Sequence, residues 1–266
     1  MNINFERLKD RITKLSEIGR TPEGGARRIA LCEEDKQGRD LVRGWMRELG
    51  LEVTIDKIGN VFGVLKGSGN KNPIMMGSHI DTVGNGGHLD GPLGVLAGLE
   101  VINTYLDHNI IPDHDLCVAF FTNEEGVRFQ PDMMGSLVYA GGYDLEKAYS
   151  TKSNDGKLLK DELQKIGYLG DMECGAIVPH AFVELHIEQG PVLEKENIEI
   201  GAVENVQGIS WSALTIKGEA NHAGTTPMHM RHDAGYAAAS VSVMVRKITE
   251  TIGHGQVGTV GVVICI

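Results

Sequence analysis

Histidine and carboxylate residues follow three apolar segments of this sequence. NPIMMGSHID ends in His79 and Asp81, DLCVAFFTNEEG ends in Glu124 and Glu125, and FVELHIEQG contains His186. Short apolar runs that stop at polar residues are typical of buried strands, and ligands gather at the carboxyl ends of strands in α/β sheets. The recurrence therefore predicts a polar site at one edge of a sheet.

Together, histidine and carboxylate side chains suit a divalent metal ion such as zinc, manganese or cobalt, and these residue types do not distinguish the three metals. In GSHIDT, Asp81 can hold the second ring nitrogen of a metal-binding His79. Asp90 lies in the glycine-rich turn NGGHLDGP, where a ligand and an ordinary helix-capping aspartate are the alternatives. His186 can be a ligand or a satisfied core histidine.

The adjacent carboxylates of TNEEG suit two different tasks. Neighbouring side chains on an extended chain point in opposite directions, so one of Glu124 and Glu125 can bind metal while the other faces a bound water. Crowded carboxylates also raise the pKa of one partner, as a general base requires. The alternative is an ordinary exposed acidic turn. In FVELHIEQG, alternation places Glu184, His186 and Glu188 on one face, unless the strand ends first.

The elements that position these residues alternate between helices and strands up to about residue 206. This order predicts an α/β domain over residues 1–206, with a central mixed sheet flanked by helices. We expect a first helix that ends near residue 15 and two more over residues 35–49 and 92–108. The expected strands lie within residues 51–67, 72–81, 115–126 and 182–190.

The remaining residues, 207–266, have a different pattern. ISWSALTIKGEA and GTVGVVICI are strand-like, and HDAGYAAASVSVMVRKITETIG between them is helical. We expect the first part of a small α+β lid domain. At the start of this helix, Arg231 and Asp233 could form a surface ion pair of little energetic value. Because the last apolar strand has no further neighbours in the sequence, we also expect a C-terminally truncated chain.

Whole-chain composition excludes several classes of protein. The 36 acidic and 25 basic residues give a net charge of -11, which argues against binding to nucleic acid. The sequence has no apolar run of membrane-spanning length and no signal-peptide core. Its four cysteines are scattered, which fits a reducing compartment. We therefore expect a cytoplasmic protein that contacts no membrane.

The motifs together resemble those of the dinuclear metal amidohydrolases of the aminoacylase and carboxypeptidase type, from about residue 1 to residue 266. The resemblance rests on GSHIDT, the GG-x-LDG-x-x-G turn, TNEEG-x-RF and ELHIEQGP. The branch that contains N-carbamoyl-L-amino-acid hydrolase, allantoate amidohydrolase and β-ureidopropionase is the most similar. In this branch, as in ELHIEQG, a histidine stands where the peptidase branches have an acidic residue.

This resemblance implies two divalent metal ions (zinc, manganese or cobalt) at the site. His79 and His186 would hold one ion, Asp90 would bridge both, and Glu125 would hold the second. Glu124 would be the general base that acts on the bridging water. The last histidine ligand, and an arginine and an asparagine for the substrate carboxylate, would lie beyond the present sequence.

Three further residues receive roles from the resemblance. Asp81 would orient His79, and Gln189 would touch the ureido group of the substrate. His222 of KGEANHAGTTPMHMRHDA would stabilise the oxyanion in a partner's site, which implies a homodimer through the lid. Without the resemblance, this segment is a Gly/Pro loop that carries a histidine.

The implied function is hydrolysis of a non-peptide linear amide C–N bond, in the carbamoyl (ureido) group of N-carbamoyl-L-amino acids or similar small carboxylates. Allantoate amidohydrolase, with the same chemistry on a product of purine breakdown, is the nearest alternative. The alternative from a different class is a truncated, non-catalytic fragment that binds at most one metal ion or a partner subunit.

Overall fold

The computed structural model describes residues 1–265, and the chain separates into two compact units. Unit 1 is Met1–Ile200 and unit 2 is Gly201–Ile266. None of the helices in the described residues is both long and apolar enough to span a membrane.

Unit 1 contains the mixed sheet that the sequence predicts, with the strand order β1-β2-β4-β3-β5. β1 with β2 and β2 with β4 are antiparallel, whereas β3 is parallel to both β4 and β5. His79 at the end of β3 pairs with Phe121 at the end of β4, so these two strands end level at the same edge. The strands are Glu52–Ile55 (β1), Val61–Leu65 (β2), Ile74–His79 (β3), Leu116–Phe121 (β4) and Ala181–Val183 (β5).

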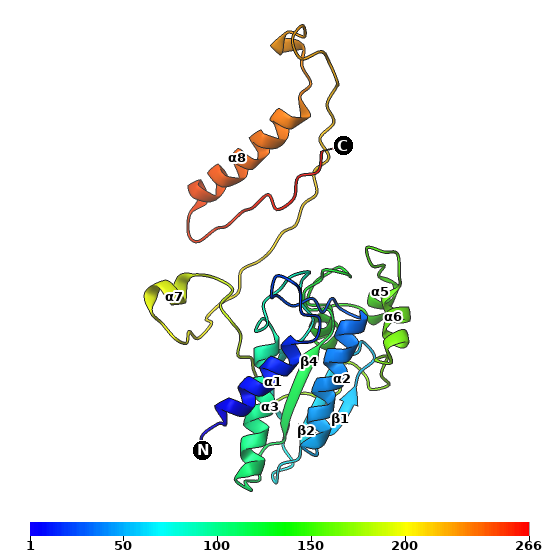
Figure 1. The fold of residues 1–266 in the computed structure, drawn as a ribbon, viewed down its shortest axis with the longest axis vertical. Coiled ribbons are helices and arrows are strands. Elements are labelled where there is room, and N and C mark those ends of the chain that lie inside the picture. The colour runs from blue at the N-terminus through cyan, green and yellow to red at the C-terminus, as the bar shows by residue number, and fades with distance from the viewer. Residues whose placement is uncertain (266) are drawn as a thin grey trace. The chain divides into compact units, whose positions relative to one another are not determined.

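Three helices lie along one face of this sheet (Figure 1). They are α1 (Phe5–Ser16), α2 (Glu33–Glu48) and α3 (Pro92–Asp107), close to the predicted bounds. α2 and α3 pack on the strands, and α1 packs on both helices. The apolar residues between helices and sheet form the main core, because a helix stripe and a sheet face exclude water only when they pack together.

A smaller apolar cluster covers the opposite face of the sheet. Phe62, Met75, Cys117, Ala119 and Phe121 alternate along the strands with residues of the main core, so they point to the other side. Tyr139 at the end of α4 packs against this cluster. The remaining helices of unit 1 are short: α4 (Met134–Tyr139), α5 (Leu145–Ser150), α6 (Leu159–Ile166) and α7 (Val192–Glu196).

Two buried arginines hold the loops beside the carboxyl edge of the sheet. Arg39 of α2 donates to Asp35 Oδ2 at 2.8 Å and to the carbonyl of Gly59 at 2.9 Å, and neither charged side chain is exposed. Arg28 donates to the carbonyl of Ile80, directly after β3, at 3.1 Å. Removing one partner from a buried charged pair is strongly destabilising, so these contacts fix the backbone that leads out of the strands.

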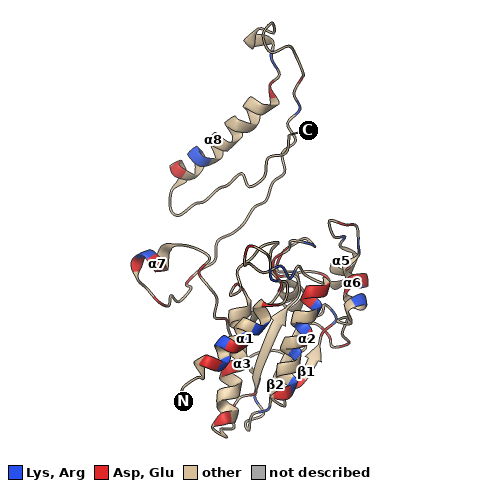
Figure 2. Cartoon of the chain, viewed as in Figure 1, with Lys and Arg blue, Asp and Glu red and all other residues tan. Residues whose placement is uncertain are grey.

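Unit 2 contains one long helix, α8 (Ala234–Ile252), and the short 3-10 helix Met228–Met230. The predicted helix is therefore present, and Figure 2 shows that most of it carries no charged side chain. The predicted strands over 209–220 and 258–266 are not formed: within residues 201–265 no β-ladder is present, and Ile266 lies outside the described residues. A strand needs a neighbour that pairs its N–H and C=O groups, and these segments have none.

Candidate metal centre

Three of the predicted ligands come together at the carboxyl edge of the sheet in unit 1. The Nε2 atoms of His79 and His186 lie 3.9 and 3.3 Å from Oδ1 of Asp90. One ligand atom from each residue lies within 4.8 Å of the other two, and residues 1–265 contain no second group of this kind. Two imidazoles and one carboxylate at this spacing suit a single divalent ion.

Backbone carbonyls orient both histidine rings. Nδ1 of His79 lies 2.9 Å from the carbonyl oxygen of Asp81, and Nδ1 of His186 lies 2.8 Å from that of Ile187. Because a carbonyl oxygen only accepts, each Nδ1 carries the proton. In a neutral ring of this tautomer Nε2 carries the lone pair that binds a metal ion.

Gly91 allows the turn that carries Asp90 to pack against the His79 ring. It stands between Asp90 and α3 with a φ of +80°, where glycine is favoured. A Cβ on Gly91 would lie 2.5 Å from Nε2 of His79. The LDG motif therefore depends on its glycine for geometric reasons that the sequence pattern does not reveal.

The carboxylate of Asp90 uses its two oxygens differently. Oδ2 accepts a hydrogen bond from Nε2 of Gln189 at 2.7 Å. Oδ1, which faces the two histidines, is buried and has no hydrogen-bond partner among residues 1–265. A buried acceptor without a partner is costly, and a cation between Oδ1 and the imidazoles would satisfy it. The donor set present therefore fits a divalent metal ion.

Asp81 is buried beside His79, and the role of its carboxylate in orienting a metal-bound ring stays a prediction. Oδ1 of Asp81 is 3.9 Å from Nδ1 of His79, and the ring instead bonds the Asp81 carbonyl. The two carboxylate oxygens accept hydrogen bonds from the backbone N–H groups of Glu124 and Glu125, both at 3.2 Å. The reason is geometric, because the turn after β4 brings two amide donors to this carboxylate.

Glu124 and Glu125 follow β4 in a turn that begins with Asn123 at a φ of +55°. Burial raises the pKa of Glu124 to about 7, against the opposing attraction of His79. Burial also raises the pKa of Glu125. Glu125 lies outside the three-ligand group, although its charge interacts with that of Asp90. The assignment of Glu125 as a ligand and Glu124 as a base stays a prediction.

In the third motif, FVELHIEQG, the side chains of Glu184, His186 and Glu188 do not share one face of a strand, because the strand ends before them. β5 ends at Val183, so the residues that follow belong to a loop. Glu184 accepts a hydrogen bond from the hydroxyl of Ser78 at 2.5 Å, and Glu188 accepts from two backbone amides at the start of α7, at 2.9 and 3.0 Å. Of the three predicted neighbours, only His186 reaches the ligand group.

In unit 2, His222 lies in a turn that is fastened by Arg231. Nδ1 of His222 accepts hydrogen bonds from the backbone N–H groups of Gly224 and Thr225, both at 3.1 Å. Arg231 donates to two carbonyl oxygens of the same turn, at 3.1 and 2.6 Å. Oδ1 of Asp233 caps α8 by accepting from the backbone N–H of Tyr236 at 2.9 Å, and within the described residues Arg231 forms no ion pair with it.

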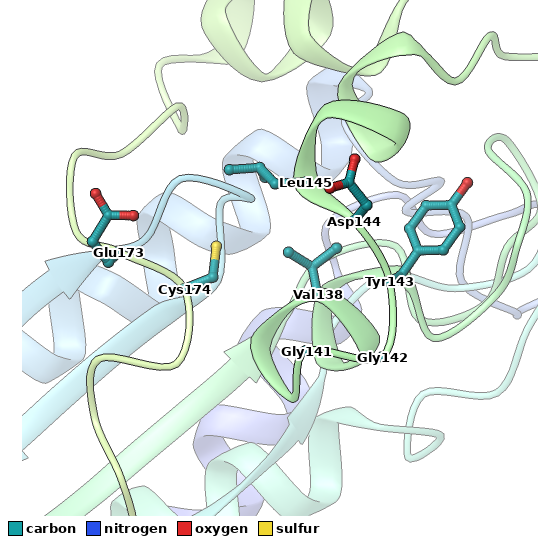
Figure 3. A pocket seen from close by; sticks show the side chains of 8 residues that line it. All are labelled: Val138, Gly141, Gly142, Tyr143, Asp144, Leu145, Glu173 and Cys174. Carbon is teal, nitrogen blue, oxygen red and sulfur yellow. The ribbon is translucent and has the colours of Figure 1, made fainter.

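Of two cavities in unit 1, one is lined by a predicted site residue and the other is not. One of about 410 Å³ is lined by Asp144, Glu173 and Cys174 among apolar residues, and it contains no predicted site residue (Figure 3). The other, of about 250 Å³, is lined by Glu124 and by apolar side chains that include Phe182. The smaller cavity, not the larger, therefore adjoins the predicted base.

Comparison with known proteins identifies the family of the chain. Residues 75–260 match the model of the Peptidase family M20/M25/M40. The chain is 44% identical over 260 residues to an N-carbamoyl-L-amino-acid amidohydrolase of Rhizobium meliloti, which covers 97% of this chain and 62% of that protein. It is 40% identical over 264 residues to the N-carbamoyl-L-amino acid amidohydrolase of Geobacillus stearothermophilus, over 97% of this chain and 64% of that protein.

A solved structure is similar over the same length. The crystal structure of an amidase of the hydantoinase/carbamoylase family from Burkholderia multivorans matches with a TM-score of 0.79 and 41% identity, over 94% of this chain and 61% of that chain. The chain thus spans a little under two thirds of the length of these relatives. The predicted resemblance to metal amidohydrolases is confirmed, and the chain belongs to the Peptidase family M20/M25/M40.

Proposed function

We propose that the protein is a metal-dependent amidohydrolase that cleaves the carbamoyl C–N bond of N-carbamoyl-L-amino acids. The observation that carries this proposal is Oδ1 of Asp90, a buried acceptor without a partner that faces Nε2 of two histidines. Such an arrangement favours a bound cation. The activity named for two relatives with 44% and 40% identity supports the substrate class.

The site would hold two divalent ions. His79 and His186 would bind one, Asp90 would bridge both, and Glu125 would bind the second. Bound ions of this kind lower the pKa of a shared water and polarise the carbonyl of the substrate. Oδ2 of Asp90, which here accepts from Nε2 of Gln189, would also be needed to hold the second ion. Gln189 would therefore release Asp90 and become available to the ureido group.

Glu124 would move the protons of the reaction. It would take a proton from the attacking water and deliver it to the leaving nitrogen, so that the products are the amino acid, ammonia and carbon dioxide. Its place supports this role, because it borders the cavity of about 250 Å³ and lies in the same turn as Glu125. A base needs this combination of access to substrate and proximity to the metal ligands.

His222 would stabilise the oxyanion from a partner chain, in a homodimer formed through unit 2. Because Nδ1 of His222 accepts two backbone hydrogen bonds, the ring proton must be on Nε2. This tautomer is the hydrogen-bond donor that an oxyanion requires. Exposed apolar side chains on α8, among them Tyr236 and Met244, support association through this unit.

The four free cysteines agree with a cytoplasmic location.

The test is an assay of the whole natural protein with N-carbamoyl-L-amino acids, the matching N-acetyl amino acids and allantoate. We expect hydrolysis of the carbamoyl compounds, its loss after chelation, and its recovery with zinc, manganese or cobalt. Faster hydrolysis of allantoate would transfer the proposal to that substrate. No hydrolysis of any compound, with at most one ion bound per chain, would favour the non-catalytic alternative.

A further inference from the structure

We propose that Ser136 is a positioning residue whose hydroxyl holds the carboxylate of Glu124 in place; this rests on the proposed function of Glu124 as the base. Oγ of Ser136 lies 3.1 Å from Oε2 of Glu124. Among residues 1–265, no other side chain hydrogen-bonds this carboxylate. With Oε2 held by the serine, Oε1 is the oxygen that can take a proton from water.

Gly135 sets the position of Ser136 at the start of α4. Its N–H donates to the carbonyl of Thr122 at 2.8 Å, and its carbonyl accepts from Nδ2 of Asn60 at 3.0 Å. A Cβ on Gly135 would lie 2.4 Å from the backbone nitrogen of Thr122, so only glycine allows α4 to approach the end of β4 this closely. Thr122 is two residues before Glu124, and the serine is thereby brought beside that carboxylate.

The backbone of Glu124 is fixed, whereas its side chain depends on Ser136. The N–H of Glu124 donates to Asp81 at 3.2 Å, and its carbonyl accepts from the N–H of Met133 at 2.8 Å. A glutamate side chain on a fixed backbone still has three rotatable bonds, which a single hydrogen bond at its end restricts. Most of the surface of the adjoining cavity is apolar, although Ser78 and Glu184 also line it, and a hydrogen bond is stronger in such surroundings than in water.

Packing of α4 does not depend on the hydroxyl of Ser136. Oγ of Ser136 also lies 3.0 Å from the carbonyl of Met133, three residues earlier, so its single hydroxyl proton is shared between this carbonyl and the Glu124 carboxylate. Ser150 of α5 makes the same kind of contact with the carbonyl of Lys147, at 2.9 Å, without a carboxylate partner in the described residues. Ser150→Ala is therefore a matched control. The buried residues of α4 are Met134, Gly135 and Val138.

The first test measures the order of the Glu124 side chain in the metal-free chain. ¹³C relaxation of labelled glutamates reports side-chain motion on the ps–ns timescale, and Glu124→Gln identifies the signal of Glu124. We expect Ser136→Ala to increase this motion, and Ser136→Thr and Ser150→Ala to leave it as in the wild type. Unchanged motion in Ser136→Ala would overturn the proposal.

The second test measures hydrolysis of an N-carbamoyl-L-amino acid by the whole, metal-loaded protein. We expect Ser136→Ala to lower kcat by about 10- to 100-fold, because a small displacement of a catalytic group has an effect of this size. KM and metal content should not change, and Ser136→Thr, which keeps the hydroxyl, should restore most of the rate. An unchanged kcat contradicts the proposal. If the wild type hydrolyses no carbamoyl compound, the proposed function fails, and the motion of Glu124 alone decides the role of Ser136.

Discussion

Replacing Gly91 by alanine tests the close packing between the Asp90 turn and the His79 ring. Gly91 has φ +80° and ψ −56°, a conformation that costs another residue about 1–3 kcal/mol. The new Cβ would lie 2.5 Å from Nε2 of His79, and displacing a buried ring costs about 1–3 kcal/mol more. Gly91→Ala should therefore lower the free energy of unfolding by about 2–6 kcal/mol.

The same displacement should weaken metal binding, because it moves the nitrogen that would bind the ion. Urea unfolding of the metal-free chain measures the first effect, and calorimetric titration with zinc measures the second. Gly87→Ala is the matched control in the same turn, since a Cβ there would meet nothing within 4 Å. We expect this control to change the free energy of unfolding by no more than about 0.5 kcal/mol.

A double-mutant cycle with His79→Ala separates the two costs. In the His79→Ala chain the ring is absent, so Gly91→Ala should retain only its backbone cost of about 1–3 kcal/mol. An equal cost in both backgrounds would refute the steric part of the reasoning. A Gly91→Ala chain as stable as Gly87→Ala, with the same affinity for zinc, would refute all of it.

Three further substitutions test the remaining contacts of the site. His186→Ala should remove a tightly bound ion that we expect elemental analysis to detect in the wild type. His180→Ala should retain it, because this exposed ring packs against His114 outside the ligand group. Glu124→Gln should keep the metal and lower the hydrolytic rate by about 10²–10⁴-fold, and a full rate would exclude Glu124 as the base. Asp81→Asn should lower the free energy of unfolding by about 1–3 kcal/mol in urea, because its NH₂ group leaves one amide of the Glu124–Glu125 turn without an acceptor. An unchanged urea midpoint would contradict this last expectation.

The strand ends that carry His79 and Glu124 are predictable from sequence, because each follows an apolar run of strand length. Parallel pairing of β3 and β4 then brings both ends to one edge. The same reasoning fails for Glu184 and Glu188. β5 is the last strand of the sheet, pairs only with β3 and stops at Val183. Beyond that residue a loop sets the side-chain directions, and alternation no longer applies.

Contacts between residues far apart in sequence leave no local pattern. Gln189 and Asp90 are 99 positions apart and are joined by a hydrogen bond of 2.7 Å. Ser136 meets Glu124 across the loop between β4 and α4, although nothing in MMGSLVYAG marks the serine as part of a site. The carboxylate of Asp81 is a similar case, since the turn after β4 supplies its partners. Such contacts depend on how loops fold back on the sheet, which residue types and spacing do not specify.

Backbone strain and an unsatisfied acceptor occur around the same ligand group. Asn123, Met133 and Gln189 have φ values of +55°, +52° and +55°, and each adjoins a turn that carries a site residue. Oδ1 of Asp90 is buried without a partner. Each strained residue and the unpaired oxygen cost about 1–3 kcal/mol of folding free energy. A bound cation would offset only the cost of the unpaired Asp90 oxygen. Metal binding should therefore stabilise unit 1 in proportion to the logarithm of free metal concentration, while the strained turns keep the ligands in place before the ion arrives.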